Sequence, residues 1–370
     1  MADVAGMVAR DGRSATFGAR RQRTDAARKS ADVTHRSLAV ISVGTPQLSG
    51  VPTMLRCRRL PLTLALFVLA APLHALDILI TNDDGLSANV RALYQALRSE
   101  GHQVMVSVPC RNQSGQGAAL NFLRPVGPLT ADCVGGIAHV GAPGVGSDAG
   151  DADLHYVDGT PVMALLYGLD LLAEPRWGHQ PQLIISGPNE GNNTGLVNPS
   201  SGTVNNAVYG INRGIPSVAV SADGDTANNP VLAAETAQIV LKLVDELERR
   251  AGHGALLPDG TGLNVNVPRF AAGEGDSLRF ARAVVGTYST VSPVFVANLA
   301  ADPVASGLGI TAALPGISFT SMDAATAESN SEALLIGQGK IAVSVIEGNF
   351  GAGPVDKSRA LLRVNGLFKP

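Results

Sequence analysis

The chain has 370 residues, of which 28 are Lys or Arg and 31 are Asp or Glu. Residues 1–75 carry 11 of the basic and 4 of the acidic residues, so the chain from Leu76 onward has 17 basic and 27 acidic residues and a net charge of −10. This negative field opposes binding to polymeric nucleic acid, which requires a basic surface, but it does not oppose a small anion held by a metal. The remaining length suits one large domain, or a domain with an extension.

The first 75 residues divide into two segments that precede any globular pattern. Residues 54–75 have a basic start, an apolar core of 12 residues and a small residue before a cleavage point, which is typical of a secretory signal peptide. Because a spanning helix needs about 20 apolar residues, we expect no permanent membrane anchor, and we expect a periplasmic or secreted protein cut after Ala75 or Ala71. Residues 1–53 are rich in Arg, Ala and Ser and are predicted to be disordered, with Met54 as the true start.

Residues 76–270 alternate short apolar runs with helical patterns. The runs predict strands at 77–81, 103–108, 183–186, 217–221 and 263–267. The helical patterns lie at 89–98, at 161–172, at 202–213 and in a longer segment from Asn229-Pro230 to Gly252. Such alternation predicts a parallel sheet with right-handed crossovers. We therefore expect a Rossmann-like α/β domain, with a mostly parallel sheet flanked by helices.

The pattern changes after Pro268. The segments 277–320 and 333–346 show β-type runs and loops with few helical signals. Residues 271–370 are therefore predicted to form a β-rich, antiparallel C-terminal extension rather than a second Rossmann unit.

Asp83 and Asp84 follow the first predicted strand directly. In an open α/β sheet, ligands bind beyond the carboxyl ends of the strands. Two adjacent carboxylates repel each other unless a cation or a proton joins them, and oxygen ligands favour a hard divalent ion such as Mg²⁺, Mn²⁺ or Ca²⁺. The alternative is a plain acidic turn, since Asn-Asp-Asp-Gly also suits a tight turn after a strand.

Polar loops also follow the next predicted strands. Ser114 follows the second strand, and Asn189 follows the third in a loop that continues to Ser201 and Thr203 at a predicted helix start. Parallel strands bring these loops to one edge of the sheet, where they supply oxygen ligands and a helix N-terminus whose free N–H groups suit a phosphate. Each residue also has a structural interpretation: Ser114 and Asn189 as loop and turn residues, Ser201 and Thr203 as helix caps.

Together these motifs resemble the SurE (survival protein E) family of metal-dependent 5′/3′-nucleotidases. The matching pieces occur in the family's order over most of residues 76–270: Asn82-Asp83-Asp84-Gly85, Asn112-Gln113-Ser114-Gly115, Gly159-Thr160-Pro161, 186–195, Ser201-Gly202-Thr203-Val204 and 263–268. After Pro268 the similarity is confined to the neighbourhood of residues 339–344. Cys110, Gln113 and Pro188 depart from the residues that many members carry, which leaves substrate preference open.

The resemblance implies a set of site residues. One divalent cation, Mg²⁺ or Mn²⁺, is expected to be ligated by Asp83, Asp84, Ser114 and Asn189, with the two aspartates as catalytic residues. The phosphate is expected to be held by Asn193, Ser201, Gly202 and Thr203. The implied reaction is hydrolysis of nucleoside 5′- or 3′-monophosphates, with a metal-activated water or an aspartate as nucleophile. The family's C-terminal part helps to build oligomers, so a homo-oligomer, a dimer or a tetramer, is expected.

Two other function classes share this layout. A dinucleotide-binding oxidoreductase would carry G-x-G-x-x-G after the first strand, where Asn82-Asp83-Asp84-Gly85 stands instead. A non-catalytic nucleotide- or cation-binding protein on the same scaffold would keep both the fold and the ligands. The sequence does not separate this second class from an enzyme.

Cys110 and Cys133 are the two cysteines that follow residue 75. Export would permit them to pair. Their spacing does not establish their distance, so two independent buried thiols are the alternative.

Overall fold

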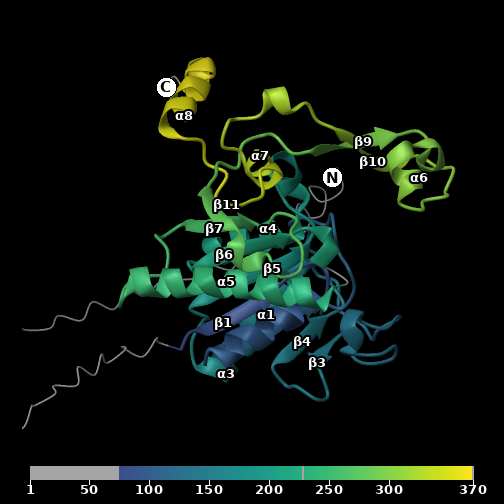
Figure 1. Ribbon diagram of the computed structural model, residues 1–370, viewed down its shortest axis with the longest axis vertical. Helices are drawn as coiled ribbons and strands as arrows, with labels where there is room; N and C mark the ends of the chain where they lie inside the picture. Colours follow the sequence, from purple (N-terminus) through teal and green to yellow (C-terminus); the bar gives the residue numbers. More distant parts are fainter. Residues whose placement is uncertain (1–74, 227–228, 369–370) are drawn as a thin grey trace, which may run out of the picture. The chain divides into compact units, whose positions relative to one another are not determined.

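The computed structural model describes residues 75–226 and 229–368. The central strands of its main sheet are β1 (Asp77–Thr81), β2 (Gln103–Pro109), β5 (Leu183–Glu190), β6 (Ser217–Ala222) and β7 (Thr261–Asn266). One edge is formed by β3 (Val145–Ser147) and β4 (Leu154–Val157), and the other by β11 (Lys340–Glu347) and β8 (Arg279–Arg282). The strand order is β3-β4-β2-β1-β5-β6-β7-β11-β8 (Figure 1).

Most neighbouring strands of this sheet are parallel. The strands β4, β2, β1, β5, β6 and β7 all run in the same direction, whereas β3 is antiparallel to β4 and β11 is antiparallel to β7. The five central strands lie where the apolar runs predict them, but β5 continues past the predicted end at Ser186 to Glu190. Asn189 therefore lies in this strand and not, as predicted, in the loop that follows it. The predicted Rossmann-like α/β fold with a mostly parallel sheet is therefore confirmed. The edge strands β3 and β4 are not among the predicted strands, because they are short and show no extended alternation of apolar and polar residues.

The central strand β1 is buried because helices cover both faces of the sheet. Ile78 and Ile80 pack with side chains of α1 (Ala88–Ser99) and α5 (Pro230–Ala251), which lie side by side in Figure 1. Leu79 packs with Met105 and with Leu165 of α2 (Pro161–Tyr167) on the opposite face. Successive side chains of a strand point to opposite faces, so a strand covered on both sides is apolar throughout.

Polar caps begin the predicted helices. Ser87 Oγ accepts a hydrogen bond from the Val90 N–H at the start of α1, and Asn229 caps α5 in the same way. The single helix predicted over 161–172 is instead divided into α2, a π-helical turn (Gly168–Leu172) and α3 (Ala173–Trp177). A Cβ atom at Gly168 would lie 3.0 Å from Leu79 Cδ1, so this glycine lets the turn approach β1 closely.

The chain after β7 contains more helix than the sequence pattern predicts. The strands β9 (Val291–Val296) and β10 (Gly316–Ser321) form an antiparallel hairpin. The helices α6 (Pro303–Gly307), α7 (Glu332–Gly337) and α8 (Pro354–Arg363) also occur here. The prediction of strand and loop over 333–346 is wrong at α7, because a short apolar run does not distinguish a helix from a strand. The antiparallel prediction is wrong at β8, which runs parallel to β11.

Shorter helical turns complete the described chain. They lie at Val134–Gly136, Gly195–Ser200, Gly224–Thr226, Gly275–Ser277, Leu299–Ala301, Ala324–Thr326 and Asn365–Phe368. None of the helices within 75–226 and 229–368 combines the length and the hydropathy that crossing a membrane requires. The predicted disordered segment, residues 1–53, lies outside the described residues, as does the predicted signal peptide, residues 54–75, except for its last residue.

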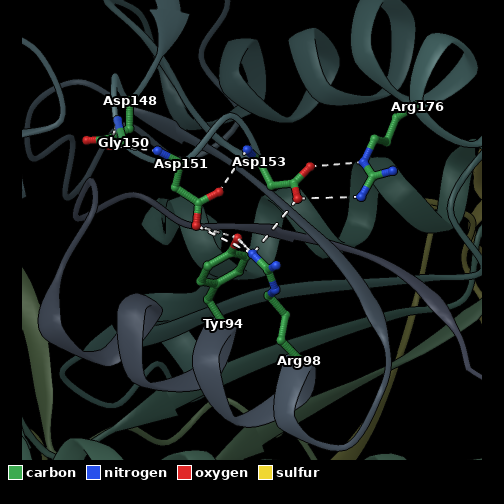
Figure 2. Close-up of polar contacts among 7 residues, drawn as sticks. All are labelled: Tyr94, Arg98, Asp148, Gly150, Asp151, Asp153 and Arg176. Atoms are coloured by element: carbon green, nitrogen blue, oxygen red, sulfur yellow. Dashed lines mark hydrogen bonds and ion pairs between the residues drawn. The ribbon is translucent and has the colours of Figure 1, made fainter.

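Ion pairs fasten the turn between β3 and β4 to two helices (Figure 2). Arg98 of α1 lies 3.4 Å from Asp151 and donates to the hydroxyl of Tyr94, which in turn donates to Asp151 Oδ2 at 2.7 Å. Arg176 of α3 donates to Asp153 Oδ1 at 2.9 Å. These partly exposed pairs are worth at most about 1 kcal/mol each. Together they fix the edge of the sheet next to β2.

Cys110 and Cys133 form a disulfide, with their Cα atoms 4.5 Å apart. Cys110 follows the end of β2, and Cys133 precedes the turn Val134–Gly136. This turn packs on the segment after β1: a Cβ atom at Gly85 would lie 2.9 Å from Val134 Cβ. The bridge therefore supports the turn that carries Asp83 and Asp84.

We expect the double variant Cys110→Ala/Cys133→Ala to have a free energy of unfolding that is lower by about 3 kcal/mol, because the bridge closes a loop with a sequence separation of 23 residues. Urea unfolding of the oxidised protein, the reduced protein and the double variant measures the difference. Reduction should lower the stability of the parent protein to that of the variant and should leave the variant unchanged. Equal stability of all three samples would show that the bridge is not structural.

Candidate functional site

The turn after β1 holds two buried carboxylates in fixed positions. The side chain of Asn82 accepts from the Gly85 N–H at 3.2 Å and donates to the Gly85 carbonyl at 2.7 Å. Gly85 has a φ of +83°, which a residue with a side chain rarely adopts. Asp83 and Asp84 are only 3% and 4% exposed. These hydrogen bonds therefore hold the two carboxylates in fixed, buried positions. The segment is not a solvent-exposed acidic turn.

Asp83 lies against the N-terminus of α4 (Gly202–Asn212). Thr203 Oγ1 donates to Asp83 Oδ1 at 2.5 Å, and the Gly202 N–H lies beside the same carboxylate. A Cβ atom at Gly202 would lie 2.7 Å from Asp83 Cβ, so glycine is required for this approach. The helix N-terminus and the first carboxylate, 120 residues apart in sequence, are thus in direct contact.

Asp84 joins the loop after β2 to the carboxyl end of β5. Asn112 Nδ2 donates to Asp84 Oδ1 at 2.9 Å, and the Glu190 N–H donates to Asp84 Oδ2 at 2.9 Å. The side chain of Ser114 also lies beside Asp84 and favours its charged form. The predicted ligands Asp83, Asp84 and Ser114 are therefore neighbours.

Asn189 carries a buried oxygen without a partner. Its Nδ2 donates to the Gly191 carbonyl at 2.6 Å, whereas its Oδ1 accepts no hydrogen bond from the described residues. The next residue, Glu190, donates its N–H to Asp84 Oδ2, so the backbone that carries Asn189 lies next to the carboxylate pair. A buried amide oxygen that lacks a donor costs free energy. A cation beside the two carboxylates would satisfy it.

Burial and mutual repulsion both disfavour full ionisation of the pair. Burial raises the pKa of Asp83 to about 6, and the charge of Asp84 adds to the rise, while the Thr203 hydrogen bond opposes it. The pKa of Asp84 is also raised by burial, against the hydrogen bonds that it accepts. A divalent cation reverses both effects, because it neutralises the two charges that the apolar surroundings penalise.

The donor set fits a hard cation. Two carboxylates, one hydroxyl and one amide oxygen are the ligand types that Mg²⁺ and Mn²⁺ prefer. Among residues 75–226 and 229–368, no three His, Cys, Asp or Glu side chains gather in an arrangement that would hold a metal ion. The candidate site therefore depends on the neutral oxygens of Ser114 and Asn189 to complement the two carboxylates.

The structure gives the predicted phosphate-binding residues other contacts as well. Ser201 Oγ accepts a hydrogen bond from the Val204 N–H at 3.1 Å. Ser201 therefore caps α4, which is the structural role considered for it as the alternative to phosphate binding. The Thr203 hydroxyl donates a hydrogen bond to Asp83. The Asn193 side chain donates to Ser221 Oγ at 2.9 Å. These contacts place all four residues at the same edge of the sheet, and their role in holding a phosphate stays a prediction.

Several residues that organise the site were not singled out by sequence reasoning. Asn112 orients Asp84, and Asn264 and Asn266 of β7 each donate to the Asn193 carbonyl, at 3.1 and 2.9 Å. Glu332 of α7 accepts from Asn264 at 2.7 Å. The alternation of asparagines in β7 is the sequence feature that could have identified two of these residues, since amides at buried strand positions need hydrogen-bond partners.

The comparisons with known proteins agree with this geometry. Residues 78–290 match the family model described as Survival protein SurE. An acid phosphatase of Yarrowia lipolytica is 37% identical over 207 residues, which is 52% of this chain and 56% of that protein, so the match spans little more than half of its length. The 5′-nucleotidase SurE of Nostoc sp. is 35% identical over 217 residues, which is 58% of this chain and 72% of that protein.

The fold is also similar to a solved structure. The crystal structure of the SurE protein from Aquifex aeolicus superposes with a TM-score of 0.57 at 27% identity and covers 77% of this chain and 99% of that one. The superposition therefore extends beyond the strands that carry the carboxylates.

Asn189→Ala should raise the Mn²⁺ concentration needed for half-saturation by about tenfold, because it removes one oxygen from the proposed ligand set. Asn189→Asp keeps an oxygen and adds a charge, so it should retain the cation but weaken binding of an anionic substrate. Isothermal titration with Mn²⁺ measures the first effect without relying on activity. Asn212→Ala, exposed at the far end of α4, is the control. Unchanged Mn²⁺ affinity in both Asn189 variants would reduce Asn189 to a turn residue.

Proposed function

Because this chain belongs to the SurE family, we propose that it is a metal-dependent phosphomonoesterase that hydrolyses nucleoside 5′- or 3′-monophosphates to nucleoside and phosphate. The enzyme class is supported by relatives named acid phosphatase and 5′-nucleotidase SurE. The observation that carries the proposal is the buried pair Asp83 and Asp84 at the N-terminus of α4, together with the buried, unpartnered oxygen of Asn189, the residue before the Glu190 N–H that donates to Asp84.

The chain's own residues prepare this site for a phosphoryl group. When bound, a divalent cation polarises the phosphoryl group and neutralises the charge that develops on it. Asp83, Asp84, Ser114 and Asn189 would hold that cation. Asn112 and the Glu190 N–H fix the orientation of Asp84, and Thr203 fixes that of Asp83. Placing these groups in advance lowers the cost of reorganisation during the reaction.

The N-terminus of α4 supplies the complementary electrostatics. Helix N-termini carry unpaired N–H groups and a partial positive charge, which favour an anion. Because α4 begins beside Asp83, its N-terminus would favour a phosphate bound next to the residues that would hold the cation. This arrangement favours a phosphate monoester over an uncharged substrate.

The variant Asp84→Asn should lose most phosphomonoesterase activity, because it removes one charge from the proposed cation site while the strands below stay intact. Treatment of the parent protein with EDTA should have the same effect, and added Mn²⁺ or Mg²⁺ should restore activity. Turnover of nucleoside monophosphates, followed by phosphate release, is the measurement. Asp170→Asn, which changes a carboxylate that pairs with Arg213 at the surface, is the matched control.

Full activity of Asp84→Asn, or of the metal-free parent with metal absent by elemental analysis, would contradict the mechanism. Binding of nucleotide without turnover in every sample would instead favour the non-catalytic alternative. Phosphate release together with a nucleotide titration of the same samples therefore separates the two classes.

The proposal includes export from the cytoplasm. It is supported by the signal-peptide pattern of residues 54–75 and by the Cys110–Cys133 disulfide, since such bonds form and persist in oxidising compartments. Protein recovered from an exporting host should begin at Leu76, or at Pro72 if the earlier cleavage point is used. N-terminal sequencing that found residues 1–53 on the mature protein would refute export by this signal.

The proposal also includes assembly with further copies of the chain. Phe295 and Ile317 on the β9–β10 hairpin are 71% and 60% exposed, and no residue of α8 is buried. A two-stranded hairpin is marginally stable alone, and clustered exposed apolar side chains mark interaction surfaces. These features support a homo-oligomer formed through residues that follow β8.

A further inference from the structure

Glu332 is a fully buried carboxylate that the proposed mechanism does not use. It begins α7 and is 0% exposed. Its Oε1 accepts from Asn264 Nδ2 at 2.7 Å and from the Ser344 hydroxyl, and its Oε2 accepts from the Gly195 N–H at 3.3 Å. The ion pairs formed by the described residues do not include it. Burying a carboxylate costs free energy, so the surrounding groups must supply hydrogen bonds to both of its oxygens.

The partners of Glu332 connect the C-terminal part of the chain to one loop of the candidate site. Gly195 lies in the loop between Asn189 and Ser201, and the buried side chain of Asn198 in that loop lies beside the same carboxylate. Asn264 shares its amide between Glu332 and the Asn193 carbonyl. Glu332 therefore contacts this loop directly at Gly195, and it contacts Asn193 indirectly through the side chain of Asn264.

Both ends of this loop lead to proposed site residues. Asn189 at the start carries the unpartnered oxygen, and Ser201 at the end caps α4, which holds Asp83 through Thr203. The middle of the loop has little freedom of its own. A Cβ atom at Gly195 would lie 2.2 Å from the Tyr288 carbonyl oxygen, and Thr194 Oγ1 donates to Ser289 Oγ at 3.1 Å. Residues after β8 thus cover the loop, while Glu332 fixes it from inside.

The donors around Glu332 favour its ionised form, and they oppose the burial that raises the pKa of this carboxyl group. An ionised carboxylate only accepts hydrogen bonds, and the Asn264 amide, the Ser344 hydroxyl and the Gly195 N–H all donate to it. A glutamine of nearly the same shape would turn an N–H group toward one of these donors. The substitution Glu332→Gln therefore changes hydrogen bonding with little change in volume.

We propose that Glu332 is a positioning residue, which fixes the loop from Gly191 to Ser200 in the geometry that binding of the substrate phosphate requires. This inference rests on the proposed phosphomonoesterase function. It assigns a role to the C-terminal part of the chain in the chemistry of the site, in addition to any role in assembly.

The experiment measures the affinity of the Mn²⁺-loaded protein for inorganic phosphate by isothermal titration, together with kcat and KM for a nucleoside monophosphate. Glu332→Gln should weaken phosphate binding and raise KM by about tenfold, as expected for the loss of hydrogen bonds to a charged group. Its Mn²⁺ affinity should stay within about twofold of the parent value, because the Glu190 N–H holds Asp84 independently of Glu332.

Ser344→Ala is the matched control, because Ser344 of β11 donates to the same carboxylate but does not contact the loop. It should lower the thermal midpoint as Glu332→Gln does, and it should leave phosphate affinity within about twofold of the parent value. Equal losses of phosphate affinity in both variants, or no loss in Glu332→Gln, would overturn the positioning role.

Glu332→Asp keeps the charge and shortens the side chain by one methylene group. It tests the positioning role if Glu332→Gln does not fold. It should weaken phosphate binding by about threefold through the Gly195 contact, the longest of the three. Unchanged affinity would overturn the inference. A parent protein that binds phosphate without hydrolysing the ester refutes only the proposed function, whereas a parent that does not bind phosphate refutes both.

Discussion

The repulsion between two buried carboxylates is the constraint on which the site depends. Asp83 and Asp84 are adjacent in sequence and almost wholly removed from water. Burial raises the pKa of both carboxyl groups, and the charge of Asp84 raises that of Asp83 further. Hydrogen bonds from Thr203, Asn112 and the Glu190 N–H offset only part of this cost. A bound divalent cation would stabilise the pair further. The buried, unpartnered oxygen of Asn189, which precedes the Glu190 N–H donor to Asp84, fits the same interpretation.

The scaffold holds this unfavourable pair in place from several directions. The Asn82–Gly85 hydrogen bonds set the turn, and the disulfide between Cys110 and Cys133 places a second turn against it. Opposite these, α4 contacts Asp83 with its N-terminus. The strands below are apolar on both faces, so the sheet provides a rigid base. The two buried carboxylates are thus held at the edge of the sheet where ligands bind in this class of fold.

Much of the fold and part of the site were predictable from the sequence. The five central strands were predictable because buried parallel strands are continuous apolar runs. The main helices were predictable because apolar residues recur at helical spacing and Asn229-Pro230 opens the longest of them. The proximity of Asp83, Asp84, Ser114 and Asn189 followed from the rule that parallel strands end at one edge. The strands β3 and β4 and the helix α7 were not predictable, because short elements are decided by tertiary contacts. Asn112, Asn264 and Glu332 act across separations that no local pattern encodes.

The most direct test of a cation joining the two carboxylates is anomalous diffraction from crystals of the protein grown with Mn²⁺. The geometry predicts one strong anomalous peak within coordination distance of oxygen atoms of Asp83, Asp84, Ser114 and Asn189, at about 2.0–2.3 Å. A peak bound elsewhere, or full Mn²⁺ binding in solution with no peak between the two aspartates, would contradict the central role of this carboxylate pair.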